Sequence, residues 1–171
     1  SSLKPFQAAA SVKAGAVDAA GFDEKELALM CASHKGEDIH VDTALSMINK
    51  LDLNIDDFEC GSHYPSDTIT RHKMIRENEV ATALHNNCSG KHAGMLALAK
   101  HLRAETKGYI NKRHLVQRTI LEYVAELSGE SDIPTETDGC SAPTPFMTIK
   151  MIAELFQSLA SCKRPELKKV Y

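Results

Sequence analysis

The stretch NNCSGKHAGMLALAKHL, residues 86–102, joins a short run of polar and reactive side chains to a longer run of small and apolar ones. Its apolar members occupy more than one face of a helix: Ala93, Met95, Leu96, Leu98, Ala99 and Leu102. A helix that is apolar on most sides belongs inside a protein, and Asn86 or Asn87 is suited to cap its first turn. We therefore predict a buried helix with Cys88 at its mouth.

Three side chains at the start of this helix share one face, because Cys88, Lys91 and His92 stand at positions i, i+3 and i+4. The helix dipole and the neighbouring amine favour a Cys88 thiolate, which can attack a substrate or bind a metal. Cys140, in the loop of residues 138–143, is a second thiol that could join it. Two thiolates and a nitrogen donor suit zinc, although the spacing matches no standard zinc signature. The alternative is a capped helix with a buried structural cysteine.

Most of the remaining chain also has helical patterns. We predict helices over 6–13, 24–33, 42–51, 66–75, 111–128 and 146–159, with Asp42 and Ser66 as caps and Gly129 as a helix end. The last helix is expected to turn six residues inward: Met147, Ile149, Ile152, Leu155, Phe156 and Leu159. Strand signals are almost absent and no repeat or linker divides the chain, so residues 1–171 are expected to form a single, mostly helical unit.

The composition excludes several classes of protein. The chain has 171 residues, a formal charge of −3 and no Trp, which argues against nucleic-acid binding. No apolar run has the length of a membrane span. Five cysteines, odd in number and widely spread, favour a reducing cytoplasm over a disulfide framework. Both ends look cut, so we expect a partial domain of a larger protein.

A second reactive pair lies at the start of the sequence, where Ser1 and Lys4 stand one helical turn apart. A lysine that burial keeps neutral can take the proton of a serine during acyl transfer. The spacing alone is a weak signal. Use of the α-amine of Ser1 as the base is disfavoured, because N-terminal nucleophile hydrolases are rich in strands.

Other polar residues receive plainer interpretations. Ser33, His34 and His40 flank a loop that contains glycine, which is where substrate-binding groups often collect. The other histidines show no paired spacing and are read as ordinary: His63, His72, His85, His101 and His114. Three further cysteines are read as core or neutral thiols: Cys31, Cys60 and Cys162.

Four stretches together resemble one family. They are SSLKPFQ (1–7), LMCASHKGE (29–37), LHNNCSGKHAG (84–94) and DGCSAPT (138–144). In order and separation they resemble the bacterial L-asparaginase II family, typified by the inducible Rhizobium enzyme, over nearly the whole chain. Lys35 departs from the family pattern, because a small residue is more usual at that position.

This resemblance implies an α+β fold similar to serine β-lactamases and glutaminases, in which the present chain is the helical part and flanking segments supply most of the sheet. It implies hydrolysis of L-asparagine to L-aspartate and ammonia, with Ser1, Lys4 and Ser33 as catalytic residues. A lysine partner of Ser33 would lie beyond Tyr171, so the fragment alone is expected to be inactive.

The same resemblance implies zinc bound by Cys88, Lys91 and Cys140, with Asp138 beside these ligands. The implied substrate contacts are His34, Asn87, Gly90 and His92. A homodimer is also implied. Two alternatives stay open, a glutaminase of the same fold and an inactive metal-binding or interaction module. Substrates that differ by one methylene are separated by only about 1–3 kcal/mol in pocket contacts, which a sequence pattern does not resolve.

Overall fold

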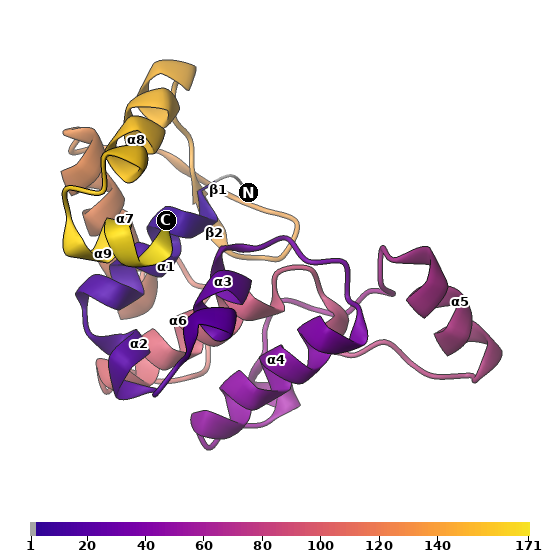
Figure 1. The fold of residues 1–171 in the computed structure, drawn as a ribbon. Coiled ribbons are helices and arrows are strands. Elements are labelled where there is room, and N and C mark those ends of the chain that lie inside the picture. The colour runs from indigo at the N-terminus through magenta and orange to yellow at the C-terminus, as the bar shows by residue number, and fades with distance from the viewer. Residues whose placement is uncertain (1–2) are drawn as a thin grey trace.

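The helix that begins after Cys88 is the centre of the computed structural model, which describes residues 3–171 (Figure 1). This helix, α6 (Ser89–His101), buries every residue from Ser89 to Ala99. It packs against α1 (Lys4–Lys13), α2 (Ala16–Ala19), α3 (Glu24–Cys31), α4 (Asp38–Lys50) and α7 (Leu115–Ser128). The prediction of a helix enclosed on most sides is therefore confirmed.

Helices α3 and α6 approach each other closely because α6 carries glycine at the contact. A Cβ atom added at Gly90 would lie 2.4 Å from the carbonyl oxygen of Leu29, well inside van der Waals contact. Only a residue without a side chain fits there. The close approach brings the loop after α3, which contains Ser33, beside the first turn of α6.

Several predicted helix starts are wrong by one to four residues. Helix α4 (Asp38–Lys50) begins four residues before Asp42, and Glu37 is at its N-cap position. Asp42 therefore lies inside the helix and does not cap it. Helix α5 (Thr68–Arg76) is capped by Asp67 and not by Ser66, since the Asp67 carboxylate accepts from the N–H of Thr70.

The ends of α6 and α7 show how side chains replace missing backbone bonds. Cys88 occupies the N-cap position of α6, while Asn86 Oδ1, two residues earlier, accepts from the Cys88 N–H at 2.9 Å. Helix α7 begins at Leu115 and not near residue 111, because the ring of His114 accepts from a backbone N–H of the first turn. It ends at Gly129 with φ +71°, as predicted.

The C-terminal region differs most from its prediction. Helix α8 spans Ile149–Ser161, and a further helix, α9 (Pro165–Val170), follows it and packs on α1. Of the six residues expected to face inward, Leu155 and Leu159 are buried, whereas Ile149 is 87 % exposed. Periodicity identified the apolar face of α8 correctly, but the described residues cover only part of that face.

A small hairpin stands between α7 and α8. Strands β1 (Thr135–Thr137) and β2 (Pro143–Pro145) pair antiparallel, with Glu136 opposite Thr144. The short 3₁₀ turns η1 (Ile55–Asp57) and η2 (Ala83–His85) complete the elements. The hairpin holds the loop of residues 138–142 against α6, which places Cys140 near the mouth of that helix.

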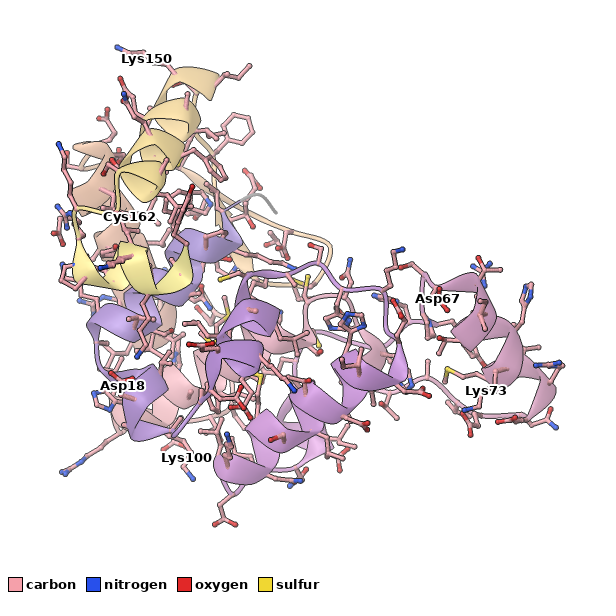
Figure 2. The ribbon with its side chains drawn as sticks, viewed as in Figure 1. Asp18, Asp67, Lys73, Lys100, Lys150 and Cys162 are labelled. Atoms are coloured by element: carbon pink, nitrogen blue, oxygen red, sulfur yellow. The ribbon has the colours of Figure 1, made fainter. Side chains whose placement is uncertain are left out.

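Helix α5 lies apart from the other helices. Figures 1 and 2 show it extending to one side of the body. Lys73 Nζ lies 3.9 Å from Asp38 Oδ2 at the start of α4. The base of α5 is anchored where the N–H of Asp67 donates to the carbonyl of Lys35 at 3.1 Å. None of the helices described in residues 3–171 has the length and hydropathy that a membrane crossing requires.

Candidate functional site

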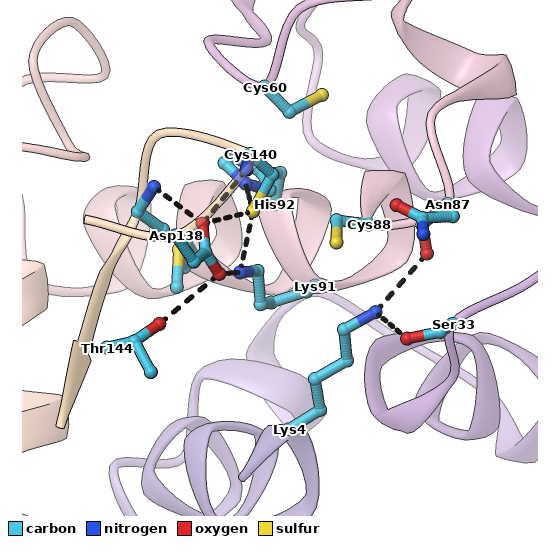
Figure 3. Close-up of polar contacts among 12 residues, drawn as sticks. Lys4, Ser33, Cys60, Asn87, Cys88, Lys91, His92, Asp138, Cys140 and Thr144 are labelled. Atoms are coloured by element: carbon cyan, nitrogen blue, oxygen red, sulfur yellow. Dashed lines mark hydrogen bonds and ion pairs between the residues drawn. The ribbon is translucent and has the colours of Figure 1, made fainter. Parts of the chain in front are cut away.

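Four segments that are distant in the sequence bring reactive side chains together (Figure 3). They are the first turn of α1 with Lys4, the loop after α3 with Ser33, the start of α6 with Cys88, and the hairpin loop with Cys140. Ser1 lies outside the described residues.

Lys4 is a buried amine surrounded by acceptors. Lys4 is only 1 % exposed. Its Nζ donates to Ser33 Oγ at 2.9 Å, to the carbonyl of Asn87 at 3.2 Å and to the carbonyl of Ala32. Burial lowers the pKa of Lys4 because it removes water from the ammonium, while the nearby Cys88 thiol opposes this shift. The structure thus gives the Ser33 hydroxyl a buried amine partner 29 residues away in sequence.

Ser33 and His34 face opposite environments although they are neighbours. Ser33 is exposed, so its hydroxyl is open to a small molecule. His34 is buried, with Nε2 2.8 Å from Ser89 Oγ and Nδ1 accepting from the N–H of Gly36 at 3.2 Å. Burial, followed by the charges of His40 and Lys4, lowers the pKa of His34 to about 4. His34 is therefore a neutral imidazole that ties the serine loop to α6.

The two predicted thiols and the predicted lysine ligand do meet. Lys91 Nζ donates to Cys140 Sγ at 2.8 Å, and the Cys140 thiol donates to Asp138 Oδ1. The nearby Cys140 sulfur, followed by the charges of Lys91 and Lys4, lowers the pKa of Cys88 to about 6 although burial opposes this shift. The nearby Cys88 sulfur, together with burial, raises the pKa of Cys140 and keeps its proton in place. Cys88 is the thiolate of the pair.

Asp138 organises the hairpin loop. Its Oδ1 accepts from the backbone N–H groups of Cys140 at 3.0 Å and Ala142 at 3.2 Å and from the Cys140 thiol at 2.9 Å. Its Oδ2 accepts from Lys91 Nζ at 3.0 Å and from Thr144 Oγ1 at 3.3 Å. Although burial alone would raise the pKa of Asp138, these donors hold it far below its usual range. The carboxylate is thereby kept ionised beside Lys91.

Lys91 is the charged partner in this cluster. Burial disfavours its ammonium, but Cys140 and Asp138 outweigh that effect and raise its pKa. The donor chemistry fits zinc, since Lys91 Nζ contacts Cys140 Sγ and the Cys88 sulfur lies in the same cluster, provided that Lys91 releases its proton on binding. Across residues 3–171, no group of three or more His, Cys, Asp and Glu side chains is arranged to hold a metal, so such a site depends on the lysine.

The other predicted substrate contacts have different surroundings. His92 is fully buried, with Nδ1 2.7 Å from Tyr109 Oη and Nε2 3.3 Å from Cys140 Sγ. Tyr109 Oη also accepts from the backbone N–H of Glu59 at 2.9 Å, so this hydroxyl joins His92 to the segment after η1. Gly90 is buried at the α3 contact. Asn87, half-buried beside Lys4, is the nearest of these residues to Ser33.

Sequence reasoning missed several supporting residues. Tyr109 holds His92 and no motif marks it, whereas Thr144, which contacts Asp138, ends the stretch DGCSAPT without having been singled out. The histidines read as ordinary include three with a structural role, His63, His85 and His114, whose rings accept the backbone N–H of Asn87, of Thr82 and of Val116. The neutral thiols were identified correctly, since burial raises the pKa of Cys31 to about 11 and of Cys60 to about 12.

The family comparison agrees with the residues that converge here. The model of the family described as L-asparaginase II matches residues 1–171, which is the full length of the chain. No individually curated protein matches the sequence. The match includes all four segments that build the Lys4, Ser33, Cys88 and Cys140 cluster, and its extent shows an amidohydrolase of asparaginase type that acts on a small molecule. The chain belongs to the L-asparaginase II family.

Proposed function

We propose that this protein hydrolyses L-asparagine through a serine ester, with Ser33 as the nucleophile that the geometry supports best and Lys4 as its base. One observation carries the assignment, namely the 2.9 Å separation of Lys4 Nζ and Ser33 Oγ. Ser33 is exposed and Lys4 is buried, so the substrate can reach the hydroxyl while the amine is shielded from water.

The surroundings of Lys4 suit a general base. A neutral amine has two N–H donors and one lone pair. The carbonyls of Ala32 and Asn87 accept the two N–H groups, which directs the lone pair toward the Ser33 hydroxyl. Lowering of the Lys4 pKa by burial favours this neutral form. In that state the hydroxyl of Ser33 donates to Nζ.

The reaction then follows the usual course of acyl transfer. Ser33 Oγ attacks the side-chain amide carbon of asparagine while Lys4 Nζ takes the hydroxyl proton. Lys4 returns this proton to the amide nitrogen, the C–N bond breaks and ammonia leaves, so that an aspartyl ester remains on Ser33. Water attacks the ester with Lys4 again as the base, and aspartate and the free serine are regenerated.

We further propose that Cys88, Cys140 and Lys91 hold a zinc ion beside this serine. When bound, zinc would supply a Lewis acid that helps to position the substrate. Asp138 supports this proposal, because its bonds to both Cys140 and Lys91 fix two of the three donors. Removal of metal by a chelator is expected to weaken substrate binding more than it slows ester formation.

Trapping of the ester tests the nucleophile. Protein quenched in acid during turnover of asparagine is digested, and the peptide that carries the added aspartyl mass is identified. Ser33→Ala should abolish the adduct and the release of ammonia, whereas Ser66→Ala, a change at an exposed serine, should leave both unchanged. An adduct on Ser1, the other candidate from the sequence, would contradict the assignment. Glutamine in place of asparagine measures the preference between the two amides.

The fold class, location and assembly of the protein are also proposals. We propose that the helices described here belong to an α+β fold similar to serine β-lactamases, and that the protein is a cytoplasmic homodimer. The odd, dispersed set of free cysteines supports the location. Sedimentation of the purified protein tests the dimer.

A further inference from the structure

The backbone of Asn87 is held at both its N–H and its carbonyl. The carbonyl accepts from Lys4 Nζ at 3.2 Å and from the backbone N–H of His34 at 3.3 Å. The N–H donates to Nε2 of His63, also at 3.2 Å. These two groups belong to consecutive peptide units joined at the Asn87 Cα, so the backbone conformation of Asn87 decides where one of the acceptors of Lys4 lies.

His63 reaches the backbone N–H of Asn87 from the loop that precedes α5. Its Nδ1 lies 2.9 Å from the carbonyl of Tyr64, which can only accept, so Nδ1 carries the ring hydrogen. Nε2 is then the bare nitrogen, and it is this atom that faces the N–H of Asn87. Both contacts are satisfied by one neutral tautomer and by no other form of the ring.

His34 is fixed in the opposite tautomer. The N–H of Gly36 donates to Nδ1, which leaves the hydrogen on Nε2, where it is donated to Ser89 Oγ. The backbone of His34 thus contacts the Asn87 carbonyl while its side chain joins the serine loop to α6. Two neutral imidazoles of opposite tautomer hold the segment from both directions.

We propose that His63 is a positioning residue of the hydrolysis, acting with the backbone of His34 to hold the Asn87 backbone so that its carbonyl orients the Lys4 amine toward Ser33. This inference rests on the proposed function of Lys4 and Ser33. His63 acts only through the backbone N–H that it binds.

Two substitutions separate positioning from simple packing. His63→Gln keeps an uncharged oxygen near the place of Nε2, whereas His63→Ala removes the acceptor. A misplacement of about 1 Å can cost about 100-fold in rate, so we expect His63→Ala to lower kcat by about 10- to 100-fold with little change in KM. His63→Gln should recover most of this loss of kcat. His72→Gln and His72→Ala, at an exposed histidine of α5, should behave as the unchanged protein.

A wild-type kcat in His63→Ala, or equal losses of kcat in both variants, would overturn the proposal. A second measurement needs neither a variant nor activity. The ¹⁵N shifts of the imidazoles should show hydrogen on Nδ1 of His63 and on Nε2 of His34, and the reverse assignment would also overturn it. If these shifts are as expected but asparagine is not hydrolysed, the proposed function fails and the hydrogen-bonded arrangement stands.

Discussion

Replacement of His34 by asparagine should remove a defined part of the acid lability of this protein. His34 is 5 % exposed, and its Nδ1 accepts from the N–H of Gly36 while its Nε2 donates to Ser89. A protonated ring has no acceptor nitrogen, so it would lose the bond to Gly36 and place a charge in a buried site. The substitution His34→Asn keeps an acceptor near the place of Nδ1 and introduces no group that titrates.

The size and sign of the effect follow from the pKa of His34. Folding lowers this pKa from 6.5 to about 4, so the unfolded chain binds more protons than the folded chain between these values. Each pKa unit corresponds to about 1.4 kcal/mol, which gives about 3 kcal/mol for the whole window. This stability is fully present above pH 6.5 and is lost as the pH falls toward 4.

Urea unfolding at a series of pH values measures the effect. From pH 6.5 to about 4 the free energy of unfolding of the unchanged protein should fall by about 3 kcal/mol more than that of His34→Asn. His72→Asn, at an exposed histidine, should follow the unchanged protein. Other titrating groups contribute equally to each curve and cancel in the difference. Parallel curves for the unchanged protein and His34→Asn would refute the assignment of a buried neutral ring.

Three further changes probe the core and the thiol cluster. Gly90→Ala should destabilise the protein by about 1–3 kcal/mol in a thermal or urea melt, because the added Cβ meets the α3 backbone, although alanine is otherwise favoured in helices by about 1 kcal/mol. Gly139→Ala, where a Cβ meets nothing within 4 Å, should be nearly neutral, and equal losses would contradict the packing argument. The ultraviolet absorbance of a thiolate should titrate with a pKa of about 6 and vanish in Cys88→Ser; persistence of this titration in the variant would assign it to another thiol. Tyr109→Phe removes a buried hydroxyl with two hydrogen-bond partners and should cost about 1–3 kcal/mol, whereas Tyr171→Phe, at a 75 % exposed ring, should cost almost nothing.

The sequence predicted those parts of the fold that depend on local chemistry. Helix α6 was recognisable because its apolar residues cover more than one face, and α7 ended at Gly129 because a left-handed residue stops a helix cheaply. Helix starts were less certain, as Asp42 shows, because several nearby residues can cap and tertiary contacts choose among them. The exposure of Ile149 could not be predicted, because periodicity defines a face without stating what covers it.

The residues of the candidate site also divide into those that local spacing predicts and those that only the folded chain brings together. Cys88 and Lys91 could be placed together from their helical spacing. Cys140 was a candidate as a second loop thiol, and the family resemblance assigned it to the same site. The bond between Lys4 and Ser33 joins residues 29 positions apart, and it depends on the close approach of two helices. No pattern in the sequence marked His63, because the role of its ring depends on one backbone N–H, that of Asn87, which lies 24 residues away in the sequence.

The position of helix α5 makes it a suitable place to attach a label. It stands away from the helical body, while its base is tied by Asp67 to the loop that contains Gly36. A dye, affinity tag or surface linker attached at an exposed position of this helix, such as Ile69, would therefore sit away from the body that carries the proposed catalytic groups. The same change made at residues 63–67 would pull on the segment that is bonded to Lys35, and so on the loop that contains Ser33.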